Sequence, residues 1–248
     1  MFFKEFSAAV RDFSMGFKII QKLNLWKYFF IPVLIAIVVG ILIFTLAYFL
    51  SGPLGIWLAD FWPFDWGSGT VKSIAVFMGG FLVIMFGLIV FKHVVMALSA
   101  PFMGPLSEKI EMQITGKPLD ISDTASEKMR LLVRGIRVNV RNLLLELLIS
   151  LPLFLLSFIP VINLFTGFAL LYTQWYFAGY GNLDYALERH YNFSDTKSVV
   201  REHKGLAVGN GFIFHLLLMI PLVGIVLALP LSTAAATVSV VRFTSKQP

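Results

Sequence analysis

The sequence contains no cysteine, and only 14% of its 248 residues are charged. Without cysteine there can be no disulfide bond, thiol nucleophile or cysteine metal site. The four histidines do not show the spacing of a zinc site. A P-loop, a G-x-S-x-G elbow, a dinucleotide fingerprint and a nucleic-acid-binding motif are also missing. We therefore expect neither an enzyme nor a cofactor, metal or nucleic-acid partner.

The chain is instead rich in apolar residues. Hydrophobic residues make up 58% of the chain, which has 25 phenylalanines and a mean hydropathy of +0.82. Inside the longest apolar stretches the charged or histidine residues are Lys72, Glu146 and His215. The composition predicts a single all-α integral membrane domain spanning 1–248. The stretches are 28–51, 71–91, 143–159, 161–180 and 212–241.

The first two stretches are long enough to cross a bilayer, whose core of about 30 Å needs about 20 helical residues. Apolar sequence continues beyond the second stretch, so we predict long spanning helices over 28–51 and 71–100. We expect Lys92 at the cytoplasmic interface, with its amine reaching water. The second helix should bend or stop at Pro101 and Pro105.

The later stretches predict two helical hairpins. Residues 143–180 are broken at Pro160, and residues 212–241 are interrupted at Pro221 and Pro230. Two full crossings need about 40 residues, more than the last stretch offers. It is either one tilted span or a hairpin that enters only part of the bilayer. The basic tail after residue 241 favours the hairpin.

Lysine and arginine concentrate in four segments and leave the loop 52–72 with one, Lys72. By the positive-inside rule these segments, including the N-terminus, lie on the cytoplasmic side of a multi-pass membrane protein. Their charge faces anionic lipid headgroups, which makes membrane lipids expected partners. The basic segments are 1–27, 92–142, 181–211 and the tail after 241.

Residues 1–27 predict an amphipathic helix. Lys4, Arg11 and Lys18 recur every seven residues, opposite apolar residues spaced by three and four. Such a helix lies in the headgroup plane or packs along the cytoplasmic mouth of a helix bundle. Its apolar positions are Phe2, Phe6, Val10, Phe13, Phe17 and Ile20.

Residues 106–142 predict a basic helical segment on the cytoplasmic side. The run 120–123 supplies N-cap residues for a helix that continues through Arg141. Arginines at spacings of four, three and four then form one stripe, which either rests on anionic headgroups or concentrates anions at a pore mouth. The stripe consists of Arg130, Arg134, Arg137 and Arg141.

Two carboxylates and a histidine stand out beside this segment. Glu146 is a functional candidate because it lies in apolar sequence, or it pairs at the interface with Arg141 or another base. Glu108 either caps a helix after the proline bend or pairs with a stripe arginine. We expect His215 to be hydrogen-bonded rather than a metal ligand.

Several strings, in order along the chain, resemble the CysZ sulfate permeases of the etoposide-induced protein superfamily. The resemblance implies a helical bundle with two long spanning helices and partly penetrating hairpins, in a homo-oligomer of the bacterial inner membrane. It also implies a permease that takes up sulfate or a related oxyanion for sulfate assimilation and cysteine synthesis, without ATP or metal. The matching strings are Gly16–Lys18, Ile31–Pro32, Ser99–Glu108 with Thr115–Gly116, Phe158–Pro160, Asp184–His190, Met219–Leu222, Pro230 and Ala236–Thr237.

One motif of that family is altered here. A G-x-R-R string before the first spanning helix, tied to sulfate binding in the family, reads Asn24, Leu25, Trp26 and Lys27. A helix start still favours an anion, but the two guanidinium forks that bind an oxyanion bidentately are lost. We expect anion binding at these four positions. The candidates for pathway or gating residues are Glu108, Arg130, Arg134, Arg137, Arg141 and Glu146. The alternative function is a non-transporting scaffold that organises lipids or proteins.

Overall fold

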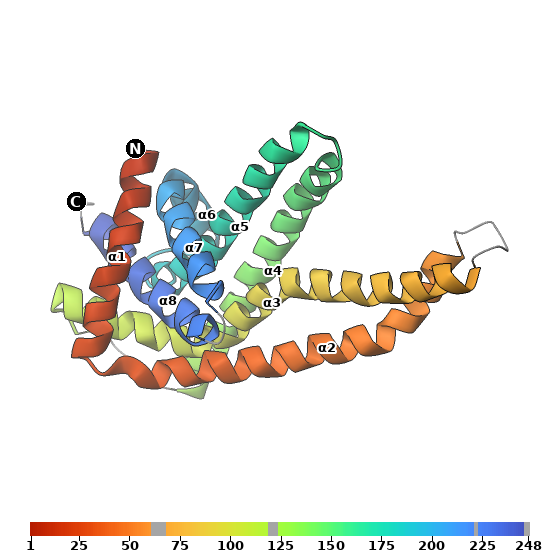
Figure 1. The fold of residues 1–248 in the computed structure, drawn as a ribbon. Helices are drawn as coiled ribbons and strands as arrows, with labels where there is room; N and C mark the ends of the chain where they lie inside the picture. The colour runs from red at the N-terminus through yellow and green to blue at the C-terminus, as the bar shows by residue number, and fades with distance from the viewer. Residues whose placement is uncertain (61–67, 119–123, 221–222, 246–248) are drawn as a thin grey trace.

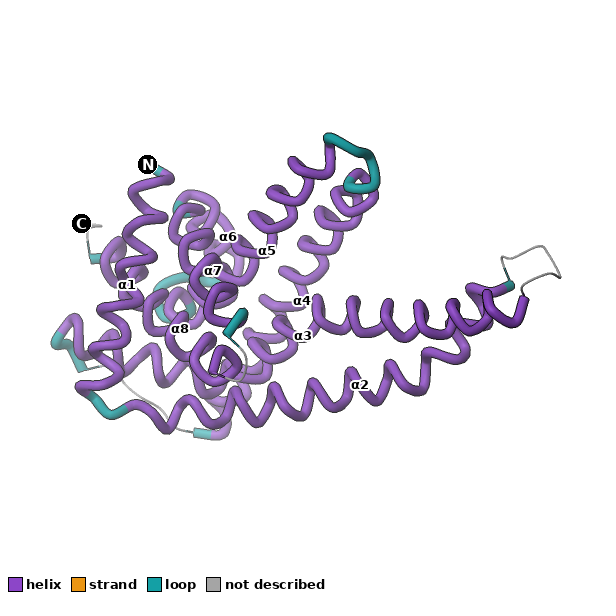
Figure 2. Tube along the Cα trace, in the orientation of Figure 1, coloured by secondary structure: helices purple, strands orange, loops and turns teal. Residues whose placement is uncertain are grey.

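The computed structural model describes residues 1–60, 68–118, 124–220 and 223–245, and their secondary structure is helical (Figure 1). Short loops join the helices (Figure 2). This confirms the all-α class. The elements are α1 (Phe2–Lys22), the 3-10 helix η1 (Leu25–Phe29), α2 (Phe30–Ala59), α3 (Ser68–Thr115), α4 (Ala125–Leu156), α5 (Ile162–Leu187), α6 (Phe193–Glu202), α7 (Lys204–Leu218) and α8 (Val223–Thr244).

Helices α2 and α3 form a long arm that projects from the rest of the molecule (Figure 1). The 30 residues of α2 extend about 45 Å, more than the thickness of a bilayer core. Near the end of the arm a Cβ on Gly55 would lie 2.3 Å from the Val76 Cα, so the two helices can touch here only through glycine. Large apolar side chains such as Phe44 and Phe77 are exposed along the arm, as suits contact with lipid.

Proline does not end α3, which continues through Pro101 and Pro105 to Thr115. Of the two predicted outcomes, a bend or a stop at these prolines, the stop is therefore wrong, as is the expected end of the helix at residue 100. Each proline removes one backbone hydrogen bond, but the segment is held by packing: Met103, Leu106 and Ile110 are fully buried. Glu108 consequently lies inside a helix and caps nothing.

Helices α4 and α5 form a second arm, which leaves the body in a different direction (Figure 1). The predicted break at Pro160 is confirmed, since α4 ends at Leu156 and α5 begins at Ile162. The N-cap of α4 is Thr124, whose side chain accepts the Glu127 N–H at 3.3 Å. The predicted cap run, 120–123, lies outside the described residues. How deeply this arm enters a membrane stays a prediction.

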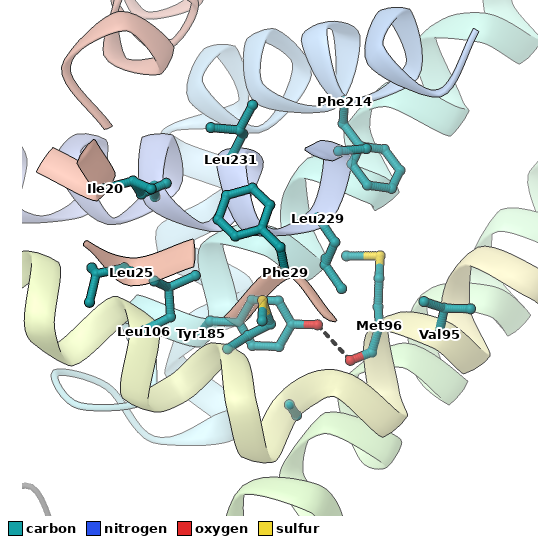
Figure 3. Close-up of a cluster of buried hydrophobic side chains, with 14 of the residues drawn as sticks. Ile20, Leu25, Phe29, Val95, Met96, Leu106, Tyr185, Phe214, Leu229 and Leu231 are labelled. Carbon is teal, nitrogen blue, oxygen red and sulfur yellow. Dashed lines mark hydrogen bonds between the residues drawn. The ribbon is translucent and has the colours of Figure 1, made fainter. Parts of the chain in front are cut away.

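The body gathers α1, α7, α8 and parts of α3 and α5 around an apolar core (Figure 3). Phe29 and Met96 belong to this core, and the Tyr185 hydroxyl donates to the Met96 carbonyl at 2.5 Å. Within the described residues four segments are long and apolar enough to cross a membrane, yet in α8 78% of the apolar window is buried inside the protein. These four segments are Leu25–Ala59, Ser68–Thr115, Ala125–Leu156 and Val226–Thr244.

The last two helices depart from the predicted hairpin in one respect. Pro230 lies inside α8 and does not interrupt it, because α8 is enclosed by neighbouring helices that hold its backbone. Helix α7 ends at Leu218 and α8 begins at Val223, while Pro221 lies outside the described residues.

Helix α1 packs on α7 and α8, which favours the second of its two predicted placements, along the bundle. Its buried residues do not follow the phenylalanine stripe, since Asp12 is buried and Phe17 is exposed. Asp12 accepts hydrogen bonds from Ser239, at 2.6 Å, and from Arg242. A buried carboxylate therefore ties the N-terminal helix to the last one.

Candidate functional site

The expected anion-binding segment forms the bend between α1 and α2. Asn24 adopts a left-handed conformation, with φ of 51°, and this turns the chain from α1 into η1. Leu25 is buried, whereas Trp26 and Lys27 are exposed. The four predicted residues therefore divide into a turn, an anchor and two outward-facing side chains.

A second lysine joins Lys27 at this bend. The second lysine is Lys109, on α3. The Lys27 ammonium nitrogen lies 5.4 Å from the centre of the Tyr28 ring, and the Lys109 ammonium nitrogen lies 5.9 Å from the centre of the same ring. Lys109 also lines an open groove of about 430 Å³ with Leu23, Leu25, Met112 and Gln113. Within the described residues neither lysine has a carboxylate within ion-pair distance. The bend thus places two lysines, without an ion-pair partner among the described residues, near one aromatic ring.

Sequence reasoning missed Lys109. It directly follows Glu108 at the end of a string used for the family resemblance, but nothing local places it beside Tyr28, 81 positions earlier in the numbering. Only the continuation of α3 past its prolines brings the residue back to the start of α2. A lysine at this position does not by itself indicate a binding site, because the segment around it is generally basic.

The arginines of the predicted stripe on α4 interact mostly with other groups of the protein. Arg130 pairs with Glu127, its Nε donating at 2.9 Å, and Arg134 donates twice to Asp184, at 2.9 and 3.2 Å. The guanidinium of Arg141 lies over the Tyr180 ring at 4.6 Å. The remaining stripe residue, Arg137, lies over the ring of Phe193. The stripe therefore interacts mainly with protein groups rather than forming one open cationic face.

A second arginine centre, which the sequence did not reveal, lies where α3 meets the end of α5. Arg189 donates to Glu111 at 2.8 and 2.9 Å and to the Ser107 hydroxyl at 2.7 Å. His190 contacts the other oxygen of Glu111 at 2.9 Å. Glu108 makes no side-chain hydrogen bond within the described residues, but it lies in the electrostatic field of Arg189.

Glu188 is the unusual acid of this region. Burial and, to a lesser extent, the nearby charge of Asp184 raise its pKa to about 8, against the opposing charges of Arg189, Arg134 and Arg130. Its Oε1 lies over Gly104, where a Cβ would approach to 3.0 Å. Glu188 is therefore protonated at neutral pH in the folded protein.

Glu146 is buried and bonded to two bases of α3. It accepts from the Lys92 Nζ at 2.6 Å and contacts the His93 Nε2 at 2.9 Å. Of the predicted alternatives, the partner is thus another segment's base and not Arg141. Lys92 is only 8% exposed, so the expectation that its amine reaches water is wrong. The amine is held inside the protein by its hydrogen bond to the Glu146 carboxylate.

His215 is hydrogen-bonded, as expected, through its Nδ1 to the Gly211 carbonyl at 2.9 Å. Among the described residues no group of three or more histidines, aspartates and glutamates is arranged to hold a metal ion.

The chain is similar to a known protein family and to several of its members. A family described as Sulfate transporter CysZ/Etoposide-induced protein 2.4 matches residues 12–228. The sulfate transporter CysZ of Pseudomonas paraeruginosa is 29% identical over 231 residues, 92% of each chain. The protein of the same name from Pseudomonas aeruginosa is 31% identical over 163 residues, 65% of each chain. A third, from Pseudomonas fluorescens, is 34% identical over 147 residues, 58% of each chain.

Proposed function

The chain belongs to the family of the sulfate transporter CysZ and the etoposide-induced protein 2.4, and on that premise we propose that it is a sulfate permease of the bacterial inner membrane. It is a multi-pass helical membrane protein. In this proposal it carries sulfate, or a related oxyanion, into the cell for assimilation and cysteine synthesis. It works as a homo-oligomer with its N-terminus in the cytoplasm.

The pair of lysines at the start of α2 is the observation that carries the proposal. Lys27 and Lys109 hold their ammonium groups within 6 Å of the Tyr28 ring. A dianion that settles between them neutralises both charges at once. Together they take the place of the two arginines of the family motif, with Lys109 supplied from α3. Because ammonium groups are point charges without a planar fork, we expect weak discrimination among tetrahedral oxyanions.

The paired arginines act later along the path in this proposal. Arg134 and Arg189 are held by Asp184 and Glu111, so they become available to an anion only when a pair opens. Arg130, Arg137 and Arg141 flank them on α4, and Glu108 lies in their field. Glu146 keeps α3 and α4 in register and so shapes the passage.

Equilibrium binding of radiolabelled sulfate to the purified protein tests the site. Lys27→Ala and Lys109→Ala should each weaken binding by about three- to tenfold, since one charge-assisted contact at a partly exposed site contributes roughly 1 kcal/mol or somewhat more. The double variant should bind more weakly than either. Lys72→Ala is the matched control, because this exposed lysine lies near the start of α3, about ten helical turns before Lys109. Unchanged binding by the double variant would refute the site.

A further inference from the structure

A chain of uncharged polar side chains lies in the core of the body, apart from the arginine stripe. Its members come from α3, α5, α7 and α8, and each is at most 1% exposed. We call this set the polar ladder. It consists of Ser107, Asn182, Asn210, Ser232, Thr233 and Thr237.

Hydrogen bonds connect one end of the polar ladder to the charged site. Arg189 donates to the Ser107 oxygen at 2.7 Å, and the Ser107 and Thr237 hydroxyls lie 2.7 Å apart. Thr237 donates in turn to the Thr233 carbonyl at 2.8 Å, which leaves Ser107 as the donor to Thr237. The chain is thus continuous from the guanidinium of Arg189 into α8.

The other end reaches the contact between α5 and α7. The Asn210 amide donates to the Ser232 carbonyl at 2.9 Å, and the Asn182 amide donates to the Asn210 side-chain oxygen at 2.8 Å. The polar ladder therefore links Ser107 on α3, through α8 and α7, to Asn182 in the last two turns of α5.

The polar ladder contains polar atoms that have no hydrogen-bond partner among the described residues. The Ser232 and Thr233 hydroxyls and the Asn182 side-chain oxygen form no hydrogen bond, although these residues are not exposed at all. Helical threonines elsewhere, such as Thr173 and Thr244, donate to the carbonyl four residues earlier. Buried polar groups are rarely left unpaired, so these atoms are free to hydrogen-bond a water molecule or a ligand.

Pro230 adds a weak point in α8 beside these hydroxyls. It has no N–H to donate to the Val226 carbonyl, so the helix lacks one backbone bond just before Ser232 and Thr233. In membrane proteins such a freed carbonyl is satisfied by side chains or water, and the helix can bend there. The unpaired hydroxyls thus lie next to the point where α8 lacks a backbone hydrogen bond.

We propose that the transported anion crosses the protein core along the polar ladder, passing from Arg189 to the Ser232 and Thr233 hydroxyls. This inference rests on the proposed function and specifies its route. Neutral hydroxyl donors suit passage because they replace part of the hydration of an anion without holding it as an ammonium would. Water fills the route between transport events and satisfies the Asn182 oxygen.

The absence of cysteine from the chain makes this route directly testable, because a single introduced thiol has no background. Ser232→Cys, reconstituted in liposomes, should react with the sulfonate-bearing reagent 2-sulfonatoethyl methanethiosulfonate, and sulfate should slow the reaction. Ala236→Cys is the control: it is equally buried on the same helix but lies in an apolar cluster. Labelling of Ser232→Cys no faster than the control, or labelling that sulfate does not slow, overturns the route.

A second variant separates transport from structure. Thr233→Val keeps the shape of the side chain and removes an unpaired hydroxyl, so thermal stability should stay equal or rise. Sulfate uptake should nevertheless fall by about fivefold, the factor expected for one lost hydrogen bond to the passing anion. Uptake equal to that of the unaltered protein overturns the proposal. Absence of uptake by the folded, unaltered protein refutes the sulfate function instead, and the labelling rates still report whether the ladder admits an anion.

Discussion

The buried Glu146 pair offers the sharpest test of how the two arms are joined. Its carboxylate, on a residue only 2% exposed, accepts from Lys92 at 2.6 Å and contacts His93 at 2.9 Å. Glu146→Gln removes the charge that balances Lys92 while keeping the side-chain shape. The buried ammonium is then left uncompensated between α3 and α4.

The expected loss is large, because removing one partner of a buried ion pair costs about 3–5 kcal/mol. In a chain of this size each kcal/mol lowers the melting temperature by about 2–4 °C, so we expect a fall of about 10 °C. The double variant Lys92→Gln, Glu146→Gln should recover most of this fall, because no buried charge then lacks a partner.

Thermal unfolding in detergent, monitored by size-exclusion chromatography, measures the loss in the single variant and the recovery in the double variant. Glu127→Gln is the control, because the Glu127–Arg130 pair is exposed and contributes at most about 1 kcal/mol. A Glu146→Gln variant as stable as the control would show that the pair contributes little. Additive losses in the double variant would show that Lys92 and Glu146 do not depend on each other.

Three further predictions concern the body of the molecule. Because the pKa of Glu188 is raised to about 8 from an ordinary value of 4.5, its contribution to stability should be lost as pH rises from about 4.5 to 8. Glu188→Gln should therefore reduce the fall in stability between about pH 6 and 8.5 in unfolding curves, and an unchanged fall would exclude Glu188 as its source. Gly179→Ala should prevent most of the protein from folding, because its Cβ would lie 1.8 Å from the Ala207 carbonyl oxygen. The yield of folded protein in chromatography measures this, and a normal yield would mean that α5 and α7 are not in such close contact. Asp12→Asn should speed hydrogen exchange across α1 by weakening its bonds to α8, and equal exchange rates would show that other contacts hold this helix.

The class of the fold and its main arm were predictable because they depend on local sequence. An apolar run of helical length must form a helix if it is to enter a bilayer, whatever its neighbours are. The break at Pro160 was predictable for a similar reason, since the turn at the tip of the α4–α5 arm is exposed and no packing offsets the missing hydrogen bond.

The effect of prolines inside packed helices could not be predicted from local sequence. Pro101, Pro105 and Pro230 all lie within continuous helices, because buried side chains around them stabilise the segment more than one lost bond destabilises it. The strength of that packing is a tertiary property and is not visible in the residues next to a proline.

The partners of charged residues were the least predictable part of the site. Glu146 pairs with Lys92, 54 positions away, and Arg189 pairs with Glu111, 78 positions away. Nothing in the local spacing distinguishes these pairs from the nearer Arg141, because the choice depends on how α3 passes α4 and α5. The placement of Lys109 beside Lys27 has the same origin.

Sulfate entry into proteoliposomes tests the central claim most directly. Vesicles with the purified protein, empty vesicles and vesicles with the Lys27→Ala, Lys109→Ala double variant would receive radiolabelled sulfate under one gradient. The account predicts uptake well above that of empty vesicles, and a reduced initial rate in the double variant. Uptake by the folded protein no faster than by empty vesicles would contradict the sulfate permease and favour the scaffold function.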